Sequence, residues 1–145
     1  MKTSSTIHNC CVFDLQKVHN KSGNLTYVEQ FHHLWFNIKR VYYLYDVPGG
    51  ADRGGHAHKK LQQLIVAASG SFDVILDDGI SRKVVELNRP NFGLIIIPGI
   101  WRELTNFSSG AICLVLASEK YDPQDYIRSY DSFLKYKKII SSGNG

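Results

Sequence analysis

Short apolar runs, each bounded by turn-forming residues, recur along most of the chain. Several of them alternate apolar and polar side chains, which is the period-2 pattern of a strand with one buried face. Many such runs separated by short turns are typical of an all-β sandwich or barrel. The predicted strands cover residues 12–15, 25–29, 38–45, 56–58, 63–68, 72–76, 83–87, 93–97 and 112–117.

Glycine-containing turns separate several of these strands. Ser69-Gly70-Ser71 and Asp77-Asp78-Gly79 are hairpin-type turns, because glycine accepts the positive φ that a tight turn requires. A longer loop opens at Pro48 and runs to Gly54-Gly55. The turns therefore support many short antiparallel strands within one domain that spans residues 1–145.

Only the C-terminal end has a helical pattern. Asp122 can cap a helix and Pro123 suits its first position. Apolar side chains then recur at helical spacing from Tyr126 to Lys137. We therefore predict a short C-terminal helix beginning near Asp122, with a tail over about residues 136–145 that is frayed from Ser141.

Charge and composition narrow the classes of function. Of 145 residues, 43% are hydrophobic, and 17 Lys and Arg against 13 Asp and Glu give a net charge of +4. The chain can therefore bury a proper core, and it is mildly basic. Its basic residues are scattered, whereas a nucleic-acid-binding protein normally gathers them into a patch. An anionic small molecule fits this charge better than nucleic acid does.

Nothing in the sequence indicates a membrane or secreted protein. The first nine residues are polar, and the longest apolar run, near residues 94–101, is interrupted by Pro98 and Gly99. Three cysteines are an odd number, and two of them are adjacent, which fits neither a disulfide framework nor a CxxC metal site. We expect a cytoplasmic protein with reduced thiols.

Two histidines stand out within a glycine-flanked segment. Gly50 is followed after five residues by His56 and His58, then after four residues by Gln63 and after six by Gly70. Residues two apart in a strand point to the same face, so both imidazoles are expected to project together into the interior. The spacing resembles the first cupin motif, in which Glu usually stands at the position of Gln63.

A second segment has the order of the second cupin motif. A strand over residues 93–97 is followed by Pro98-Gly99 and then by Asn106, and Arg102 stands where the motif normally has a histidine. The resemblance implies a cupin jelly-roll barrel. Because an amide and a guanidinium replace two usual metal ligands, we expect no catalytic metal.

The side chains that remain suit proton transfer. Imidazoles ordinarily titrate near neutral pH, and arginine can hold a phosphate in bidentate fashion. Strand alternation places Arg40 and Tyr42 on one face and Tyr43 and Tyr45 on the other. These groups favour proton transfer on an anionic, carbonyl-bearing substrate. Tyr42 as core filler and Arg53 as a solvated loop residue remain simpler alternatives.

Four segments are similar to the sugar-nucleotide 3,4-ketoisomerases that act on dTDP-4-keto-6-deoxyglucose. The resemblance extends from about Gly23 to Tyr136, and its most specific parts are residues 38–43, 53–60, 98–103 and 116–131. It implies a metal-free, cofactor-free cupin that forms a homodimer in the cytoplasm. It also implies a role in making 3-amino-3,6-dideoxyhexoses for bacterial surface glycans such as the O-antigen of lipopolysaccharide. A pyridoxal-phosphate aminotransferase would then use the product.

The resemblance also implies roles for individual residues. His56 would be the base, His58 its partner in proton transfer, and Tyr42 a hydrogen-bond donor to the enediolate. The substrate-binding residues would be Arg40, Arg53, Arg102 and Gln63.

Arginine at position 102 resembles the family members whose product has the gluco configuration at carbon 4. Ser22, where the family has a larger Tyr or Arg, departs from the pattern. Three rival classes are a dTDP-sugar 3,5-epimerase, a metal-dependent cupin such as a dioxygenase, and a non-catalytic sugar-nucleotide-binding cupin.

Overall fold

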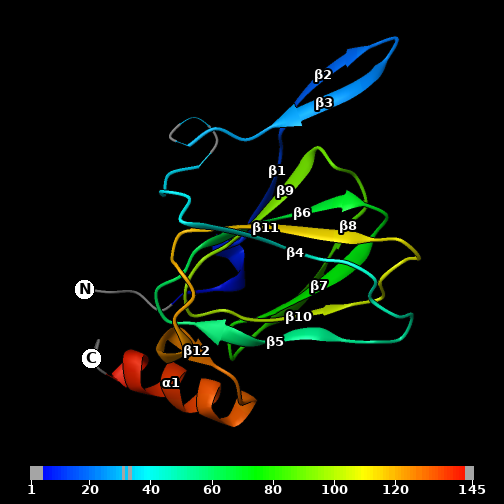
Figure 1. Ribbon diagram of the computed structural model, residues 1–145. Coiled ribbons are helices and arrows are strands. Elements are labelled where there is room, and N and C mark those ends of the chain that lie inside the picture. Colours follow the sequence, from blue (N-terminus) through cyan, green and yellow to red (C-terminus); the bar gives the residue numbers. More distant parts are fainter. Residues whose placement is uncertain (1–4, 31, 33, 143–145) are drawn as a thin grey trace.

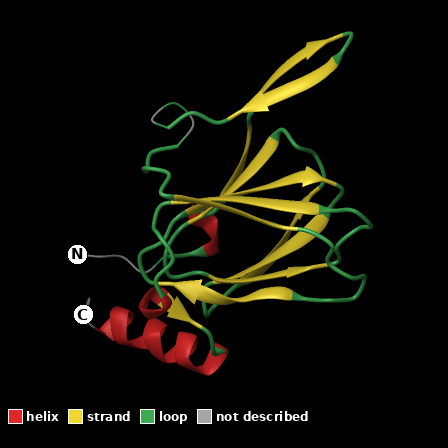
Figure 2. Cartoon of the chain, viewed as in Figure 1, coloured by secondary structure: helices red, strands yellow, loops and turns green. Residues whose placement is uncertain are grey.

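Two five-stranded antiparallel sheets form the body of the protein in the computed structural model, which describes residues 5–30, 32 and 34–142 (Figures 1 and 2). The first sheet has the order β1 (Cys11–Asp14), β9 (Phe92–Ile96), β6 (Gln63–Ser69), β11 (Ile112–Ala117) and β4 (Arg40–Leu44). The second has the order β12 (Tyr126–Ile127), β5 (Arg53–His58), β10 (Trp101–Thr105), β7 (Phe72–Asp77) and β8 (Arg82–Leu87). The prediction of an all-β jelly-roll barrel is confirmed.

The main core lies between the two sheets, and strand β6 shows how the sequence builds it. Ile65 and Ala67 belong to the core cluster that also holds buried residues of β7, β9, β10 and β11. Leu64 and Val66 point to the opposite face and pack in a second cluster with the buried Leu34 and other apolar residues. Because both faces of β6 are covered, its sequence is a continuous apolar run and not an alternating one.

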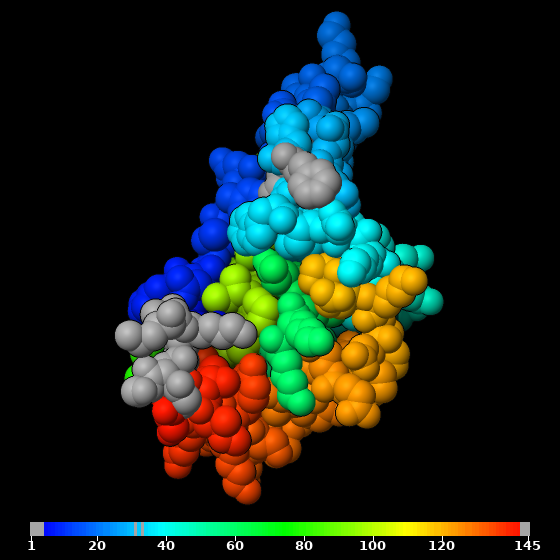
Figure 3. Space-filling view, turned by 90° about the vertical axis from the view of Figure 1, so that its left-hand side faces the viewer, coloured from blue at the N-terminus to red at the C-terminus, as the bar shows by residue number. Residues whose placement is uncertain are grey.

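A separate hairpin extends from the body of the protein. Strands β2 (Gln16–Asn20) and β3 (Gly23–Tyr27) pair only with each other, and all of β2 is exposed. Figure 3 shows this hairpin standing above the rest of the molecule. The sequence analysis predicted one strand over residues 25–29 and missed β2, because an exposed strand has no buried face to impose alternation.

The C-terminal region differs from the prediction. Asp122 caps only a short 3₁₀ turn, η2 (Pro123–Asp125), where its side chain accepts a hydrogen bond from the backbone N–H of Gln124 at 2.9 Å. The chain then forms β12, in which Tyr126 pairs with His58. The helix α1 spans Tyr130–Ser142, so the predicted start near Asp122 is wrong. This ladder with β5 requires extended backbone, which overrides the local helical signals.

Helix α1 continues through residues 136–142, so the predicted tail is wrong there, while residues 143–145 lie outside the described residues. The helix is anchored because Phe133 is fully buried and the Lys137 Nζ donates to the carbonyls of Ser5 at 2.7 Å and Gly99 at 3.0 Å. Together with the buried Trp101, Phe133 covers the outer face of the second sheet. No helix among the described residues is long and apolar enough to cross a membrane.

The turn between β6 and β7 requires glycine at position 70, and substitution tests this. Gly70 has φ +66°, and a Cβ there would lie 2.8 Å from the Ala111 Cα and would also meet the Ser108 hydroxyl. We expect Gly70→Ala to lower the free energy of unfolding by about 2–4 kcal/mol, because left-handed strain and overpacking add. Gly110 is the matched control, since it has φ +73° but open space around its Cα.

Urea denaturation of both variants measures the difference. Gly110→Ala should cost only the conformational part, about 1–2 kcal/mol. Equal losses in the two variants would show that crowding around Gly70 is unimportant.

Candidate active site

Two neighbouring strands, β5 and β10, bring the predicted histidines and Arg102 together inside the barrel. His56 and His58 alternate with Ala57 along β5, so both imidazoles face inward while Ala57 packs toward α1. On β10, Arg102 is the direct cross-strand partner of His56. The three side chains are all buried, with Arg102 only 2% exposed. The expectation that the two imidazoles project together into the interior is confirmed.

A chain of short contacts joins these side chains. The Nε2 atoms of His56 and His58 lie 3.1 Å apart, with the two rings nearly perpendicular. The Arg102 Nη2 is 3.3 Å from the His56 Nε2. The same Nη2 donates a hydrogen bond to the Tyr42 hydroxyl at 2.9 Å, which ties the second sheet to β4 of the first. The site therefore spans the interior between the sheets.

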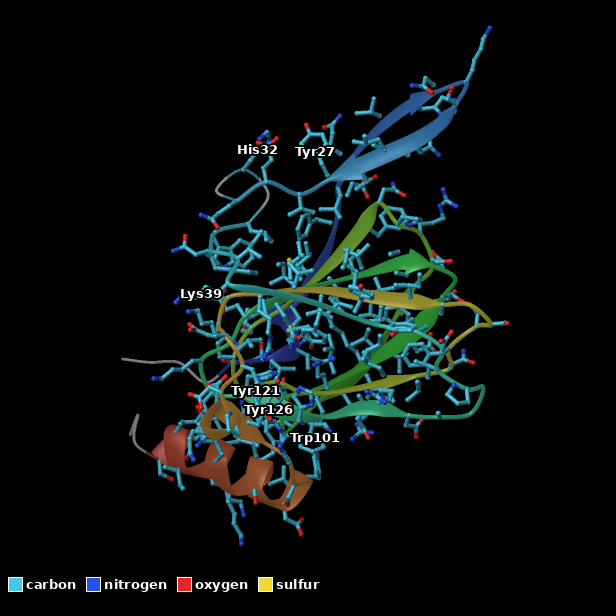
Figure 4. The ribbon with its side chains drawn as sticks, viewed as in Figure 1. Tyr27, His32, Lys39, Trp101, Tyr121 and Tyr126 are labelled. Atoms are coloured by element: carbon cyan, nitrogen blue, oxygen red, sulfur yellow. The ribbon has the colours of Figure 1, made fainter. Side chains whose placement is uncertain are left out.

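Aromatic rings and two further arginines form the rim of the site. The Arg40 guanidinium lies over the rings of Tyr42 and Tyr121, at 5.1 and 5.7 Å from their centroids, and its Nη2 donates to the Tyr126 hydroxyl at 3.4 Å. Arg128 lies 4.2 Å from the centroid of the Tyr126 ring. Tyr121 and Tyr126 stand close together beside β12 (Figure 4). Their rings hold the cations at the entrance through cation–π contacts.

A cavity of about 320 Å³ opens onto this arrangement. It accommodates a small polar molecule, and its wall combines cations, phenols and one imidazole. The lining residues are Arg40, Tyr42, Leu44, Arg53, Gly54, His56, Arg102, Leu104, Tyr121 and Tyr126. Of the two histidines, only His56 lines the cavity, and His58 lies behind it.

Burial determines the protonation of both imidazoles. Loss of solvent, reinforced by the positive charge of Arg102, lowers the pKa of His56 from 6.5 to about 2. The same two causes lower the pKa of His58 from 6.5 to about 3. The expectation that these imidazoles titrate near neutral pH is therefore wrong. Both are neutral at physiological pH, and each has one N–H donor and one lone pair.

Several buried donors around the cavity have no protein partner among the described residues. They are the Nε and Nη1 atoms of Arg102 and the Nε of Arg40. Burying an N–H donor without a partner costs folding free energy. A guanidinium only donates hydrogen bonds, so its partner must supply acceptor atoms such as oxygens. The site is therefore matched to a ligand that brings oxygen atoms to this wall.

Two predicted binding residues stand apart from this centre. Arg53 lies at the start of β5, where it is exposed and contributes to the cavity wall. Gln63 is buried on β6, its Oε1 has no partner within the described part of the chain, and it is not part of the cavity wall. A contact of Gln63 with substrate stays a prediction.

The sequence analysis missed Asp125, which lies in η2 and contacts the far side of His58. Its Oδ2 is 3.3 Å from the His58 Nδ1. It also missed Tyr121, Tyr126 and Arg128, although all four residues fall in the segment 116–131 that resembles the ketoisomerases. The resemblance of this segment to the ketoisomerases was the one signal that could have indicated them. No rule of sequence spacing connects η2 to the two histidines.

The side chains of the site do not form a metal-binding set. No group of three or more His, Cys, Asp or Glu side chains within residues 5–30, 32 and 34–142 is placed to hold a metal ion. The Arg102 cation lies 3.3 Å from the His56 Nε2, and the Asp125 carboxylate contacts only the far side of His58. This donor set does not fit a divalent cation.

Comparison with known proteins gives consistent matches over nearly the whole chain. The family model described as FdtA, WxcM-like, C-terminal, matches residues 8–138. The TDP-4-oxo-6-deoxy-α-D-glucose-3,4-oxoisomerase of Aneurinibacillus thermoaerophilus is 46% identical over 125 residues, which cover 86% of this chain and 90% of the relative.

Solved structures agree with this match. The sugar 3,4-ketoisomerase of Thermoanaerobacterium thermosaccharolyticum in complex with TDP superimposes with a TM-score of 0.89 at 40% identity, covering 92% of this chain and 98% of that one. A variant of that enzyme was solved with TDP-4-keto-6-deoxyglucose. The TDP-quinovose 3,4-ketoisomerase of Campylobacter jejuni gives a TM-score of 0.84 at 46% identity, covering 88% of this chain and 98% of that one. The protein therefore belongs to the family of sugar-nucleotide 3,4-ketoisomerases and is an isomerase.

Proposed function

We propose that the protein converts dTDP-4-keto-6-deoxyglucose into dTDP-3-keto-6-deoxyglucose. The observation that carries this proposal is a pair of neutral, contacting imidazoles, of which His56 lines a cavity whose wall also presents Arg102 and Tyr42. A neutral imidazole can take up a proton, and its neighbour can return one. Relatives described as acting on or binding this keto sugar support the choice of substrate.

The reaction moves hydrogen between two adjacent carbons. The carbon-4 ketone acidifies the carbon-3 hydrogen, and His56 removes that proton as the C–H electron pair becomes a carbon–carbon double bond. The carbonyl oxygen at carbon 4 takes up a proton, which gives an enediol. The carbon-3 hydroxyl then loses its proton to become the ketone, while carbon 4 gains one. Two protons are removed and two are returned, so the isomer forms without any cofactor.

Developing negative charge on the sugar oxygens needs stabilisation. Arg102 and Tyr42 are linked by a hydrogen bond at the cavity wall, and the Nε and Nη1 atoms of Arg102 have no partner among the residues that the structure describes. Donors fixed in a buried site stabilise an enediolate more strongly than water does, because they are already oriented. Arg40 and Arg53 at the rim are assigned to the substrate pyrophosphate, which suits their charge.

The product is assigned the gluco configuration at carbon 4. Arg102 is a permanent cation and cannot supply a proton, so carbon 4 must be protonated by another group. A histidine at this place would offer a second proton donor. The match to a TDP-quinovose enzyme is in keeping with this assignment.

The product determines what must follow. A 3-keto sugar is a substrate for transamination, so we place a pyridoxal-phosphate aminotransferase next in the sequence of reactions. The amino sugar would be a 3-amino-3,6-dideoxyhexose for a surface glycan such as an O-antigen. Nucleotide sugars are cytoplasmic metabolites, so this work belongs in the cytoplasm.

We also propose that two copies form a homodimer through the β2–β3 hairpin. Val18 and Leu25 are cross-strand partners on this hairpin, yet they are 47% and 58% exposed. An apolar groove at the base of the hairpin, of about 260 Å³, includes Leu15, Val28 and Leu114 in its wall. A second copy would cover both surfaces at once.

A 3,5-epimerase and a non-catalytic binding protein would treat this sugar differently. Both could use a cavity with a histidine and a tyrosine in its wall. An epimerase exchanges hydrogens at carbons 3 and 5 and leaves the ketone at carbon 4. A binding protein leaves the sugar unchanged.

Incubation with dTDP-4-keto-6-deoxyglucose, followed by NMR, separates these functions. We expect a sugar with its ketone at carbon 3, deuterium at carbon 4 in deuterated water, and a large H4–H5 coupling in ordinary water. A small coupling would contradict the gluco assignment. Deuterium at carbon 5 with the ketone unmoved would indicate the epimerase.

Substitution of the base supplies the matching control. His56→Asn should lower kcat by at least about 100-fold, because asparagine cannot accept the proton. His8→Asn, which changes an exposed histidine, should leave kcat unchanged. Equal rates in the two variants would exclude His56 as the base.

The lowered pKa values predict an unusual pH dependence. Because the free-enzyme pKa values of His56 and His58 are about 2 and 3, both bases stay unprotonated, and kcat/KM should be flat from about pH 8 down to about pH 5. An ordinary histidine would impose a decline below pH 6.5, and such a decline would contradict the account. Circular dichroism must accompany each point, because unfolded histidines bind protons below pH 6.5 and stability falls there.

Light scattering during gel filtration tests the dimer. The wild-type protein should have about twice the chain mass of 16.4 kDa. Val18→Lys combined with Leu25→Lys should give the monomer mass, because charge replaces the apolar pair. Val84→Lys, at an exposed valine on β8, is the control and should remain dimeric. A wild-type monomer would contradict the proposal.

A further inference from the structure

Asp125 occupies a buried position behind the two histidines. It is 7% exposed, and it ends η2 just before β12. Its Oδ1 accepts the backbone N–H of Lys60 at 2.7 Å, and its Oδ2 accepts the backbone N–H of Leu61 at 3.2 Å. The third group at the carboxylate is the His58 Nδ1, 3.3 Å from Oδ2. Two backbone donors therefore hold the carboxylate in place against the imidazole.

This contact decides which nitrogen of His58 carries the proton. A carboxylate can only accept hydrogen bonds, so the Nδ1 that faces Asp125 must be the N–H donor. Because His58 is neutral, its Nε2 is then the nitrogen with the free lone pair. The backbone bonds to Lys60 and Leu61 thus fix the tautomer of His58 through Asp125.

The tautomer of His58 in turn determines the role of His56. Only one proton fits between the two Nε2 atoms at 3.1 Å, so His56 must donate its Nε2–H to the lone pair of His58. The Arg102 Nη2, at 3.3 Å from the same His56 atom, then faces another donor and makes no hydrogen bond with it. Extra positive charge is therefore opposed more strongly on His56, beside Arg102, than on His58, which faces the Asp125 carboxylate.

We propose that Asp125 is a positioning residue that orients His58 to receive, through His56, the proton that the reaction releases. This inference rests on the proposed ketoisomerase function and extends it from the cavity wall to a residue that has no contact with the cavity. Asp125, His58 and His56 form one line from η2 to the substrate side.

The proton transfer balances along this line. The carbon-3 C–H bond breaks and an N–H bond forms at the free nitrogen of His56. The Nε2–H bond of His56 breaks, and its proton forms a new N–H bond at the Nε2 of His58. His58 is then an imidazolium paired with the Asp125 carboxylate, and His56 is neutral again. The reverse transfers return a proton to the sugar, so neither histidine changes over a full cycle.

Nitrogen-15 NMR on the free protein reads the tautomer without requiring turnover. In the wild-type protein, we expect His58 to be protonated at Nδ1 and His56 at Nε2. Asp125→Asn should raise the population of the inverted His58 tautomer, because the amide is neutral and has one oxygen for the N–H groups of Lys60, Leu61 and His58. A ring in the inverted form carries its proton at Nε2, which blocks transfer from His56.

Kinetics supply the second readout. Asp125→Asn should lower kcat by roughly 10- to 100-fold, the usual scale for losing the outer partner of a functional histidine. KM should change less than about threefold, because Asp125 does not reach the cavity. Asp122→Asn is the matched control, since Asp122 caps the same 3₁₀ turn and has no contact with His58. It should keep the wild-type tautomer and kcat.

Each outcome decides the matter. A wild-type His58 protonated at Nε2 would overturn the proposal, even if Asp125→Asn fails to fold. Equal losses of kcat in the Asp122 and Asp125 variants would show a merely structural role and would also overturn it. A wild-type protein with the expected tautomers that never moves the ketone would instead refute the proposed function, which keeps the two failures distinct.

Discussion

Burial of the Arg102 guanidinium beside two imidazoles is the constraint on which the site depends. A cation with 2% exposure raises the electrostatic cost of any further positive charge nearby. Loss of solvent, reinforced by this cation, keeps His56 and His58 neutral. Both imidazoles inside the barrel therefore stay unprotonated at neutral pH and can act as bases. The same cation is available to oxygen atoms that become negative during the reaction.

The fold makes this arrangement possible because different strands form the apolar core and the polar site. Strands β6, β9 and β11 bury continuous apolar side chains, while β4, β5 and β10 place polar side chains at one end of the interior. Cross-strand pairing of His56 with Arg102 fixes their approach through backbone hydrogen bonds. Helix α1 covers the outside of the same sheet through Phe133 and Trp101. The site is thus built on rigid strands, with only its rim on the segment after β11.

Much of this centre was predictable, because strand periodicity is local. The alternation rule placed His56 with His58 and Arg40 with Tyr42 on common faces, and the structure agrees. The start of α1, the hairpin strand β2 and the contact of Asp125 with His58 were not predictable in this way. Each depends on tertiary pairing or exposure, as when β12 pairs with β5 across more than sixty residues of sequence. The lowered pKa values also escaped prediction, because burial of the two rings is a property of the folded barrel.

The most direct test of this account is a nitrogen-15 NMR titration of His56 and His58 in the free protein. The account predicts that both rings stay neutral as the pH falls from about 8 to about 5. Titration of either buried ring near pH 6.5 would contradict the central claim that Arg102 and burial hold the pair as neutral bases.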